Sequence, residues 1–198
     1  NYTATDVNLQ ACWYTNDTGI INTTITCGTN ITGKTWPQGT NTVIVYANDS
    51  YGGIGSATRV FKIDTILPQI SIAYPNEGTN FSSTTIGVNY TTSDTNLNTC
   101  KWTKNGGTTN TTITCGTNIS STFTEGLNTV IVYVNDSANN QNSTNVTFRV
   151  DLTAPSISID YPVNNGIYRD QYNYSLSLNV SASDSGAGVQ AYKYSLNG

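Results

Sequence analysis

The sequence predicts an all-β protein built from tandem sandwich domains. Three observations lead to this fold class: segments recur at a fixed interval, apolar and polar residues alternate within them, and turn-forming residues separate them. The run Asn41–Tyr46 recurs as Asn128–Tyr133, an interval of 87 residues. The repeat unit is therefore about 87 residues long.

The other recurring segments place the boundaries of the repeats. Three pairs of segments align: Asn22–Ile31 with Asn110–Ile119, Gln69–Pro75 with Ser156–Pro162, and Cys100–Gly106 with Tyr192–Gly198. We expect residues 1–66 to be a repeat without its first strand, 67–153 a complete repeat, and 154–198 the first half of a third. We therefore expect the chain to be part of a longer tandem array.

Each repeat contains short segments with one apolar face. Apolar residues two apart mark the buried side of a strand. The inward sets are Ile70 and Ile72; Ile86, Val88 and Tyr90; Cys100 and Trp102; Val146, Phe148 and Val150; and, in the third repeat, Leu176, Leu178, Val180 and Ala182. Asn105-Gly106 fits a tight hairpin turn, and the apolar run Val130–Val134 fits a central strand. About seven strands in fewer than 100 residues predict an immunoglobulin-like β-sandwich.

An aromatic residue lies two positions after the first cysteine position of every repeat. These residues are Tyr14, Trp102 and Tyr194. We expect them to fill the core between the two sheets, in preference to stacking on a ligand.

The composition excludes several classes of function. The chain has no histidine, only 10% charged residues and a net charge of −4. Without histidine there is no imidazole base or ligand, and without a basic cluster nucleic acid is not an expected partner. No apolar run is long enough to span a membrane. Paired carboxylates can hydrolyse glycosides, but no such pair is predicted to line a cleft here. The sequence predicts no enzyme activity and no cofactor other than structural calcium.

Four cysteines form two equally spaced pairs. We expect disulfides Cys12–Cys27 and Cys100–Cys115, each within one repeat and across a hairpin near Asn16-Asp17 or Asn105-Gly106. A zinc site is the alternative, but cysteines 15 apart without histidine or CxxC pairs do not resemble one. Disulfides imply an oxidising, extracellular location.

The chain is rich in sequons for N-glycosylation, Asn-X-Ser/Thr. They begin at Asn1, Asn16, Asn22, Asn30, Asn48, Asn80, Asn89, Asn110, Asn118, Asn135, Asn142, Asn145, Asn173 and Asn179. Several fall between inward residues of a strand, where the side chain points outward and can carry a sugar. The alternative is that Asn and Thr merely supply polar strand faces and turns. We expect glycosylation at several sites, because attached sugar would also hydrate a surface with so few charges.

Aspartates recur at three places in the repeat. Asp64 and Asp151 end their repeats; the second strand is followed by Asp6, Asp94 or Asp184, and the long apolar strand by Asp49 or Asp136. In an immunoglobulin-like sandwich these places meet where one repeat joins the next. We expect Asp64, Asp94 and Asp136 at one junction, and Asp151 and Asp184 at the next, as ligands of Ca²⁺. The alternative is that each aspartate caps a turn.

The connections between repeats are short and end in proline. Only three residues separate Asp64 from Pro68, and three separate Asp151 from Pro155. Such connections predict a semi-rigid rod and not a flexible string of domains.

Three segments carry a resemblance to a known family: Phe148–Ile159, Val132–Asn140 and Ala182–Val189. In this order they resemble the inter-repeat seam, the penultimate strand and the second-to-third strand segment of prokaryotic immunoglobulin-like tandem repeats. The Asn/Thr bias and the density of sequons are similar to those of archaeal cell-surface glycoproteins. The resemblance implies a structural, non-catalytic segment of an extracellular glycosylated rod in a surface-layer, stalk or filament protein. Its partners would be neighbouring repeats, N-glycans and further copies in a filament or layer. The alternative is an adhesin module that binds glycans or another cell surface through loops at one pole.

Overall fold

The computed structural model describes residues 1–16, 21–107, 109–168 and 176–195. Its secondary structure is entirely β-strand within these ranges, with fourteen strands, so the all-β prediction is confirmed. Two compact units are present: residues 1–67 with 137–140, and residues 68–136 with 141–198. No helix in the described part of the chain is long and apolar enough to cross a membrane.

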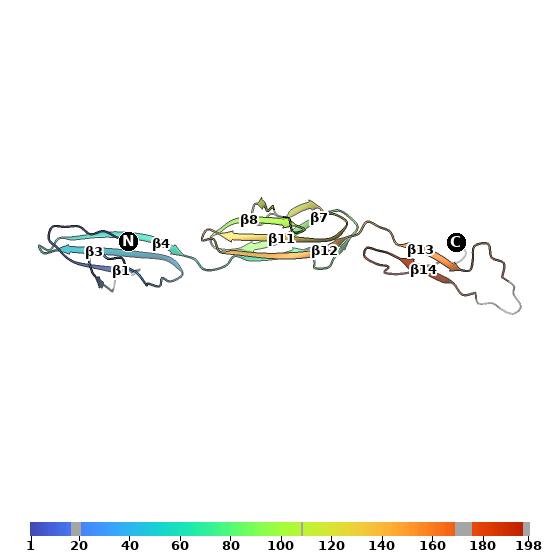
Figure 1. The fold of residues 1–198 in the computed structure, drawn as a ribbon, viewed down its shortest axis with the longest axis horizontal. Helices are drawn as coiled ribbons and strands as arrows, with labels where there is room; N and C mark the ends of the chain where they lie inside the picture. Colours follow the sequence, from blue (N-terminus) through green and yellow to red (C-terminus); the bar gives the residue numbers. More distant parts are fainter. Residues whose placement is uncertain (17–20, 108, 169–175, 196–198) are drawn as a thin grey trace. The chain divides into compact units, whose positions relative to one another are not determined.

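The first unit holds a single four-stranded antiparallel sheet. Its strands are β1 (Leu9–Asn16), β2 (Thr23–Ile25), β3 (Gly39–Asp49) and β4 (Ile54–Ile63). They lie side by side in the order β2-β1-β3-β4 (Figure 1). The predicted hairpin at Asn16-Asp17 includes a residue outside the described ranges.

The second unit holds three sheets. Its strands are β5 (Gln69–Tyr74), β6 (Asn80–Phe81), β7 (Thr85–Ser93), β8 (Leu97–Lys104), β9 (Thr111–Ile113), β10 (Ile119–Thr122), β11 (Gly126–Asp136), β12 (Gln141–Val150), β13 (Ser156–Tyr161) and β14 (Asn179–Ser183). The orders within the sheets are β10-β7-β5, β6-β12-β11-β8-β9 and β13-β14.

The first two of these sheets form a β-sandwich around one core. Inward residues of β7 and β10 pack against those of β11 and β12. The buried cluster consists of Ile86, Val88, Tyr90, Ile119, Phe123, Val130, Val132, Val146, Phe148 and Val150. The alternation in β7 and β12 predicted this face, and β11 is the central strand expected from its apolar run, with β12 on one side and β8 on the other.

Aromatic rings fix the centre of this core. Phe148 is fully buried and meets Phe123 edge-to-face, with ring centroids 4.9 Å apart and planes at 82°. Phe81 meets it in the same way at 5.6 Å. Edge-to-face pairs stabilise a core beyond the area they bury. Trp102 packs against this cluster, as predicted for the aromatic after the first cysteine.

The hairpin between β8 and β9 turns at Asn105-Gly106, as predicted. Both residues have positive φ, 54° and 67°, and the N–H of Gly107 donates to the carbonyl of Lys104 at 2.9 Å. Positive φ at both central positions is the mark of a type I′ turn, which glycine and asparagine adopt most easily.

The complete repeat has eight strands, whereas the sequence pattern predicts about seven. The additional strand is β6, whose two residues pair in parallel with the end of β12. Its alternation is too short for sequence periodicity to reveal it.

The third repeat is less buried than its sequence pattern predicts. Leu176 and Leu178 lie outside β14 and are 49% and 47% exposed, and Tyr194 is 77% exposed. The tyrosine at the same repeat position in the first unit, Tyr14, is only 5% exposed. The physical reason is that, among the residues that the structure describes, β13 and β14 form a two-stranded sheet without a second sheet packed on it.

The chain enters the complete sandwich at one end and leaves it at the other (Figure 1). At the entry end, Gln69 pairs with Ser93, the last residue of β7, and the amide of Asn142 donates to the carbonyl of Pro68 at 2.8 Å. At the exit end, Val150 pairs with Gly126, the first residue of β11. A further repeat can therefore follow without the chain doubling back.

Candidate functional site

Both predicted disulfides are present, and all four cysteines are paired. Cys12–Cys27 and Cys100–Cys115 each close a loop with a sequence separation of 15, and their Cα–Cα distances are 5.2 Å and 5.1 Å. In each pair the first cysteine is fully buried within a strand, and the second lies just beyond the short strand that pairs with it. A zinc site is therefore ruled out for these thiols.

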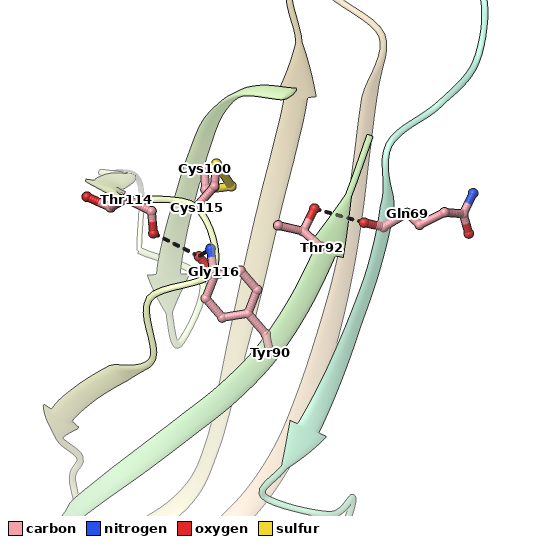
Figure 2. Close-up of a disulfide and its surroundings, with 7 residues drawn as sticks. All are labelled: Gln69, Tyr90, Thr92, Cys100, Thr114, Cys115 and Gly116. Atoms are coloured by element: carbon pink, nitrogen blue, oxygen red, sulfur yellow. Dashed lines mark hydrogen bonds between the residues drawn. A yellow bond between two sulfur atoms is a disulfide. The ribbon is translucent and has the colours of Figure 1, made fainter. Parts of the chain in front are cut away.

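The loop closed by Cys100–Cys115 is also held by a buried tyrosine (Figure 2). The hydroxyl of Tyr90 donates to the carbonyl of Thr114 at 3.3 Å and accepts the N–H of Gly116 at 3.2 Å. Burial raises the pKa of Tyr90, and the N–H of Gly116 partly opposes that rise. The disulfide and the tyrosine together anchor the β9 side of the sandwich to its core.

The first unit repeats part of this arrangement. Tyr2 stands one repeat before Tyr90, and its hydroxyl donates to the carbonyl of Thr26 at 3.1 Å. Thr26 precedes Cys27 just as Thr114 precedes Cys115. A tyrosine bonded to the disulfide loop is therefore shared by the two repeats that contain a disulfide.

Most sequon asparagines are exposed. Of the described ones, those with exposed side chains are Asn1, Asn16, Asn22, Asn30, Asn80, Asn89, Asn110, Asn118, Asn145 and Asn179. Asn89 is exposed between buried Val88 and Tyr90, as the strand alternation predicts. Asn173 lies outside the described residues.

Three sequon asparagines are half-buried and less suited to carry a glycan. The amide of Asn142 donates to Pro68, and that of Asn48 donates to Gln10 at 3.1 Å. Asn135 lies in β11 between two neighbouring strands. A sugar is attached through the amide nitrogen, so a glycan at Asn142 would break its contact with the entry segment.

Two buried asparagines contradict the expectation that Asn occupies outward faces. Asn41 and Asn128 are 0% and 1% exposed. The amide of Asn128 donates to the carbonyls of Thr124 and Gly126 at 2.7 and 3.0 Å, and its oxygen accepts the amide of Asn105 at 2.8 Å. Buried polar groups are mostly hydrogen-bonded within the protein, and the bonds of Asn128 fix the start of β11.

The sequence contains a pattern that indicates the burial of these two asparagines. Each begins the NTVIVY segment, which recurs from Asn41 to Asn128, and each is two residues before an inward valine. Neither asparagine belongs to a sequon, because the residue two positions after it is a valine. The two-residue alternation of a strand therefore assigns both asparagines to the buried face, although their polarity suggests the opposite.

Most of the recurring aspartates hold Asx-turns. In six of the seven, a carboxylate oxygen accepts the backbone N–H two residues ahead, at 2.6 to 3.1 Å; these are Asp6, Asp49, Asp64, Asp94, Asp151 and Asp184. Hydrogen bonds of this kind stabilise a turn directly after a strand. This arrangement is the alternative to calcium binding that the sequence left open.

In the second unit, Asp94 and Asp136 lie together at the entry end of the sandwich. Each has a carboxylate oxygen within 4.8 Å of the other's, and Asp136 is fully buried. Asp64 belongs to the first unit, where its carboxylate accepts the amide of Gln38 at 2.9 Å. The calcium prediction for Asp64, Asp94, Asp136, Asp151 and Asp184 stays a prediction.

Asp151 joins the end of the complete sandwich to the turn after β14. One carboxylate oxygen accepts the N–H of Ala187, and the other accepts the N–H and hydroxyl of Thr153 at 3.1 and 2.8 Å. A Cβ at Gly186 would overlap this carboxylate, so any other residue there would force the carboxylate to move. The N–H of Ala187, followed by Thr153, holds the pKa of Asp151 below its usual 3.8, and Arg149 adds a smaller effect. The two residues predicted to meet at this junction, Asp151 and Asp184, thus hold the same turn.

A groove of about 910 Å³ opens on the face of the first unit's sheet. It is lined by Val43, Val45 and Ala47 of β3, by Ala57 of β4, and by residues 1–6. The three β3 residues are half-buried, whereas Val130, Val132 and Val134, which occupy the same places in the second unit, are at most 2% exposed. Among the described residues, this face of the first unit's sheet is therefore less covered than the equivalent face in the second unit.

No family model matches this chain, and neither does any curated protein. Among solved structures, it is similar to the fibronectin(III)-like modules of Clostridium thermocellum CbhA. The identity is 15%, the match covers 75% of this chain and 82% of that one, and the TM-score is 0.42. The fold assignment therefore rests on the sheets and the core described above.

Proposed function

We propose that the chain is a structural, non-catalytic segment of an extracellular, glycosylated rod, as in a surface-layer, stalk or filament protein of an archaeal cell. The observation that carries this proposal is the path of the chain through the complete repeat. The chain enters at Pro68, leaves after Val150 at the opposite end, and there binds the next repeat through Asp151. A rod of consecutive repeats requires such a path, with entry and exit at opposite ends of each sandwich.

The disulfides support an extracellular location. Disulfides persist in oxidising compartments and are rare in the cytosol. Both bonds stabilise their repeats locally, since each closes a loop with a separation of only 15 residues. A module exposed to shear and proteases gains from such bonds because local opening of the chain is restricted.

Exposed sequons support glycosylation. Ten asparagines of sequons have side chains open to solvent, and several of them lie on strands whose opposite face is the core. With only 10% charged residues, the surface has few ions to hydrate it. Attached sugar would supply that hydration without disturbing the core.

Peptide mapping by mass spectrometry of the protein from its native source tests the proposal. We expect glycan masses on exposed sequons such as Asn89 and Asn118, and none on Asn142, whose amide is bonded to Pro68. Asn142 serves as the matched control within the same chain. Unmodified peptides at every exposed sequon would overturn the glycosylated rod.

A further inference from the structure

The β8–β9 hairpin turns on an asparagine followed by a glycine, Asn105-Gly106, which is a chemically labile pair. The backbone nitrogen of the glycine can attack the side-chain carbonyl carbon of the asparagine, and a glycine has no side chain to hinder that attack. The new N–C bond closes a succinimide ring, the C–NH₂ bond breaks, and the side-chain nitrogen leaves as ammonia. Water then opens the ring at either carbonyl, which converts the asparagine into aspartate or isoaspartate.

In the folded repeat, both polar atoms of the Asn105 side chain are bonded to the start of β11. Its amide nitrogen donates to Oδ1 of Asn128 at 2.8 Å, and its oxygen accepts the N–H of Thr129 at 2.9 Å. Asn128 is 1% exposed and is itself held by the carbonyls of Thr124 and Gly126. Closure of the succinimide ring rotates the side chain of Asn105, so it would break both contacts with β11.

The backbone of the turn is held as well. The N–H of Gly107 donates to the carbonyl of Lys104 at 2.9 Å. The carbonyl of Gly107 accepts the hydroxyl of Thr103, a residue only 6% exposed, at 3.0 Å. The nitrogen of Gly106 attacks the side chain of Asn105 only after the backbone between them rotates, and that rotation would pull Gly107 away from its partners.

We propose that Asn105 is a deamidation site that the fold keeps unreacted, and that its contacts with Asn128 and Thr129 provide this protection. The inference goes beyond the proposed function, because it concerns the chemical lifetime of the repeat and holds for any role of the rod. Conversion takes place when the turn opens or when the start of β11 is displaced. The turn lies inside the loop closed by Cys100–Cys115, so reduction of that disulfide favours opening.

The product of the reaction cannot restore the contact. A carboxylate at position 105 accepts hydrogen bonds but donates none, so it would present an acceptor to Oδ1 of Asn128, which is also an acceptor. That oxygen would keep only a longer contact, with the hydroxyl of Thr124 at 3.5 Å. Isoaspartate would also route the backbone through an additional methylene group and change the spacing of the turn. Deamidation would therefore loosen the start of β11 permanently.

The first repeat has an aspartate at the same position. Asp17 stands one repeat before Asn105, outside the residues that the structure describes, and Asn41 is the equivalent of Asn128. Oδ1 of Asn41 is buried and has no hydrogen-bond partner among the described residues. An aspartate at this position thus accompanies an unpaired acceptor at the start of the long strand, which is the outcome expected after deamidation of the second repeat.

Incubation of residues 1–198 at mildly alkaline pH tests the proposal, with conversion at Asn105 followed by peptide mapping. Replacement of NH₂ by OH raises the mass of the peptide, and chromatography separates its aspartate and isoaspartate forms. We expect Asn105 to react at least about tenfold more slowly in the folded, oxidised protein than in the same protein reduced and unfolded in urea. One hydrogen bond of ordinary strength already contributes up to about a factor of ten. Equal rates in the two samples would overturn the proposal.

Variants distinguish the contact from the general stability of the fold. Asn128→Ala removes the acceptor of the Asn105 amide and should raise the rate in the folded protein about tenfold. Val134→Ala truncates a residue 2% exposed at the far end of the same strand; it destabilises the fold but keeps the contact, so the rate should stay close to that of the unmodified protein. Thr103→Ala removes only the bond to Gly107, should raise the rate severalfold, and replaces Asn128→Ala if that variant does not fold. A rate no higher than that of Val134→Ala would show that the contact gives no protection and would overturn the proposal.

Discussion

The hydroxyl of Tyr90 accepts the N–H of Gly116 at 3.2 Å and thereby ties the inward face of β7 to the residue after Cys115. The same hydroxyl donates to Thr114, on the other side of that cysteine. The disulfide itself connects this segment to β8, so the segment is attached to both sheets of the sandwich. A covalent bond and a buried hydroxyl therefore hold one short loop.

Replacement of Tyr90 by Phe tests the polar part of this arrangement. The change keeps the ring in the core but leaves the carbonyl of Thr114 and the N–H of Gly116 without the hydroxyl. We expect a loss of about 1 kcal/mol in the free energy of unfolding, the usual value of such bonds, measured by urea denaturation. Tyr74→Phe, at a ring 42% exposed, is the control and should change stability much less. Equal stability of both variants would show that the hydroxyl of Tyr90 contributes nothing.

High pH gives a second test of the same residue. Burial raises the pKa of Tyr90 in the folded protein above the usual 10.0. The contribution of Tyr90 to stability is then fully present below pH 10 and falls as the pH rises through the folded pKa, because the unfolded chain loses its proton first. Denaturation between about pH 9 and 11.5 should show a fall in stability that is smaller in Tyr90→Phe.

Removal of the Cys100–Cys115 bond tests how much the disulfide contributes to the stability of the second unit. A loop of this length is worth roughly 3 kcal/mol in the chain-entropy model, so Cys100→Ser with Cys115→Ser should lower the unfolding free energy of the second unit by about that amount. Trp102 packs against its core and reports the transition by fluorescence when Trp13 and Trp36 are replaced by Phe. Cys12→Ser with Cys27→Ser is the matched control and should leave the Trp102 signal unchanged. An unaltered midpoint in the first variant would contradict the account.

The buried amide at Asn128 should be one of the most sensitive polar positions. Asn128→Ala removes two donated hydrogen bonds and leaves the amide of Asn105 without its acceptor. We expect a loss of about 2–3 kcal/mol, because buried groups are left unsatisfied. The exposed Asn98→Ala on β8 should cost less than about 0.5 kcal/mol. Thermal melts of the two variants side by side distinguish a structural asparagine from a merely polar one.

The junction at Asp151 should respond to acid. Its pKa lies below 3.8 because Ala187 and Thr153 donate to the carboxylate, so the contact is present above the usual pKa and lost as the pH falls through the lowered value. The amide resonance of Ala187 in NMR spectra should titrate with a midpoint below 3.8. In Asp151→Asn this titration should vanish. A midpoint at or above 3.8 would show that the contact is absent in solution.

Removal of divalent cations tests the calcium prediction. If the aspartates bind Ca²⁺, a chelator should lower the melting temperature and added calcium should restore it, since a ligand of the folded state alone stabilises that state. Asp94→Asn should abolish the response. Identical melting curves with and without chelator would contradict the calcium prediction and leave the Asx-turn as the role of Asp94.

The sequence predicted the repeat, the strand faces and both disulfides because these depend on local spacing. Alternation identified Ile86, Val88 and Tyr90 as inward residues, and all three are buried. Sequons such as Asn89 were correctly placed outside the core for the same reason. These features need no knowledge of which strands become neighbours.

Features that depend on distant partners were missed. The burial of Asn128 rests on an amide from Asn105, 23 residues away, and the bonds of Tyr90 rest on backbone more than 20 residues later. The exposure of Ile157 and Ile159 depends on which strands cover them, and alternation along one strand cannot show this. Only the assembled sheets reveal these relationships.

We expect the complete repeat to be a self-contained, disulfide-bonded module that can bear load. Stretching the chain between its ends in a single-molecule force experiment tests this most directly. We expect a discrete unfolding event for the complete sandwich. The extension gained in that event should increase by roughly 50 Å after reduction, because the 15-residue separation between Cys100 and Cys115 then adds about 3.3–3.6 Å per residue. A smooth extension without a discrete event, or an extension unaffected by reductant, would contradict it.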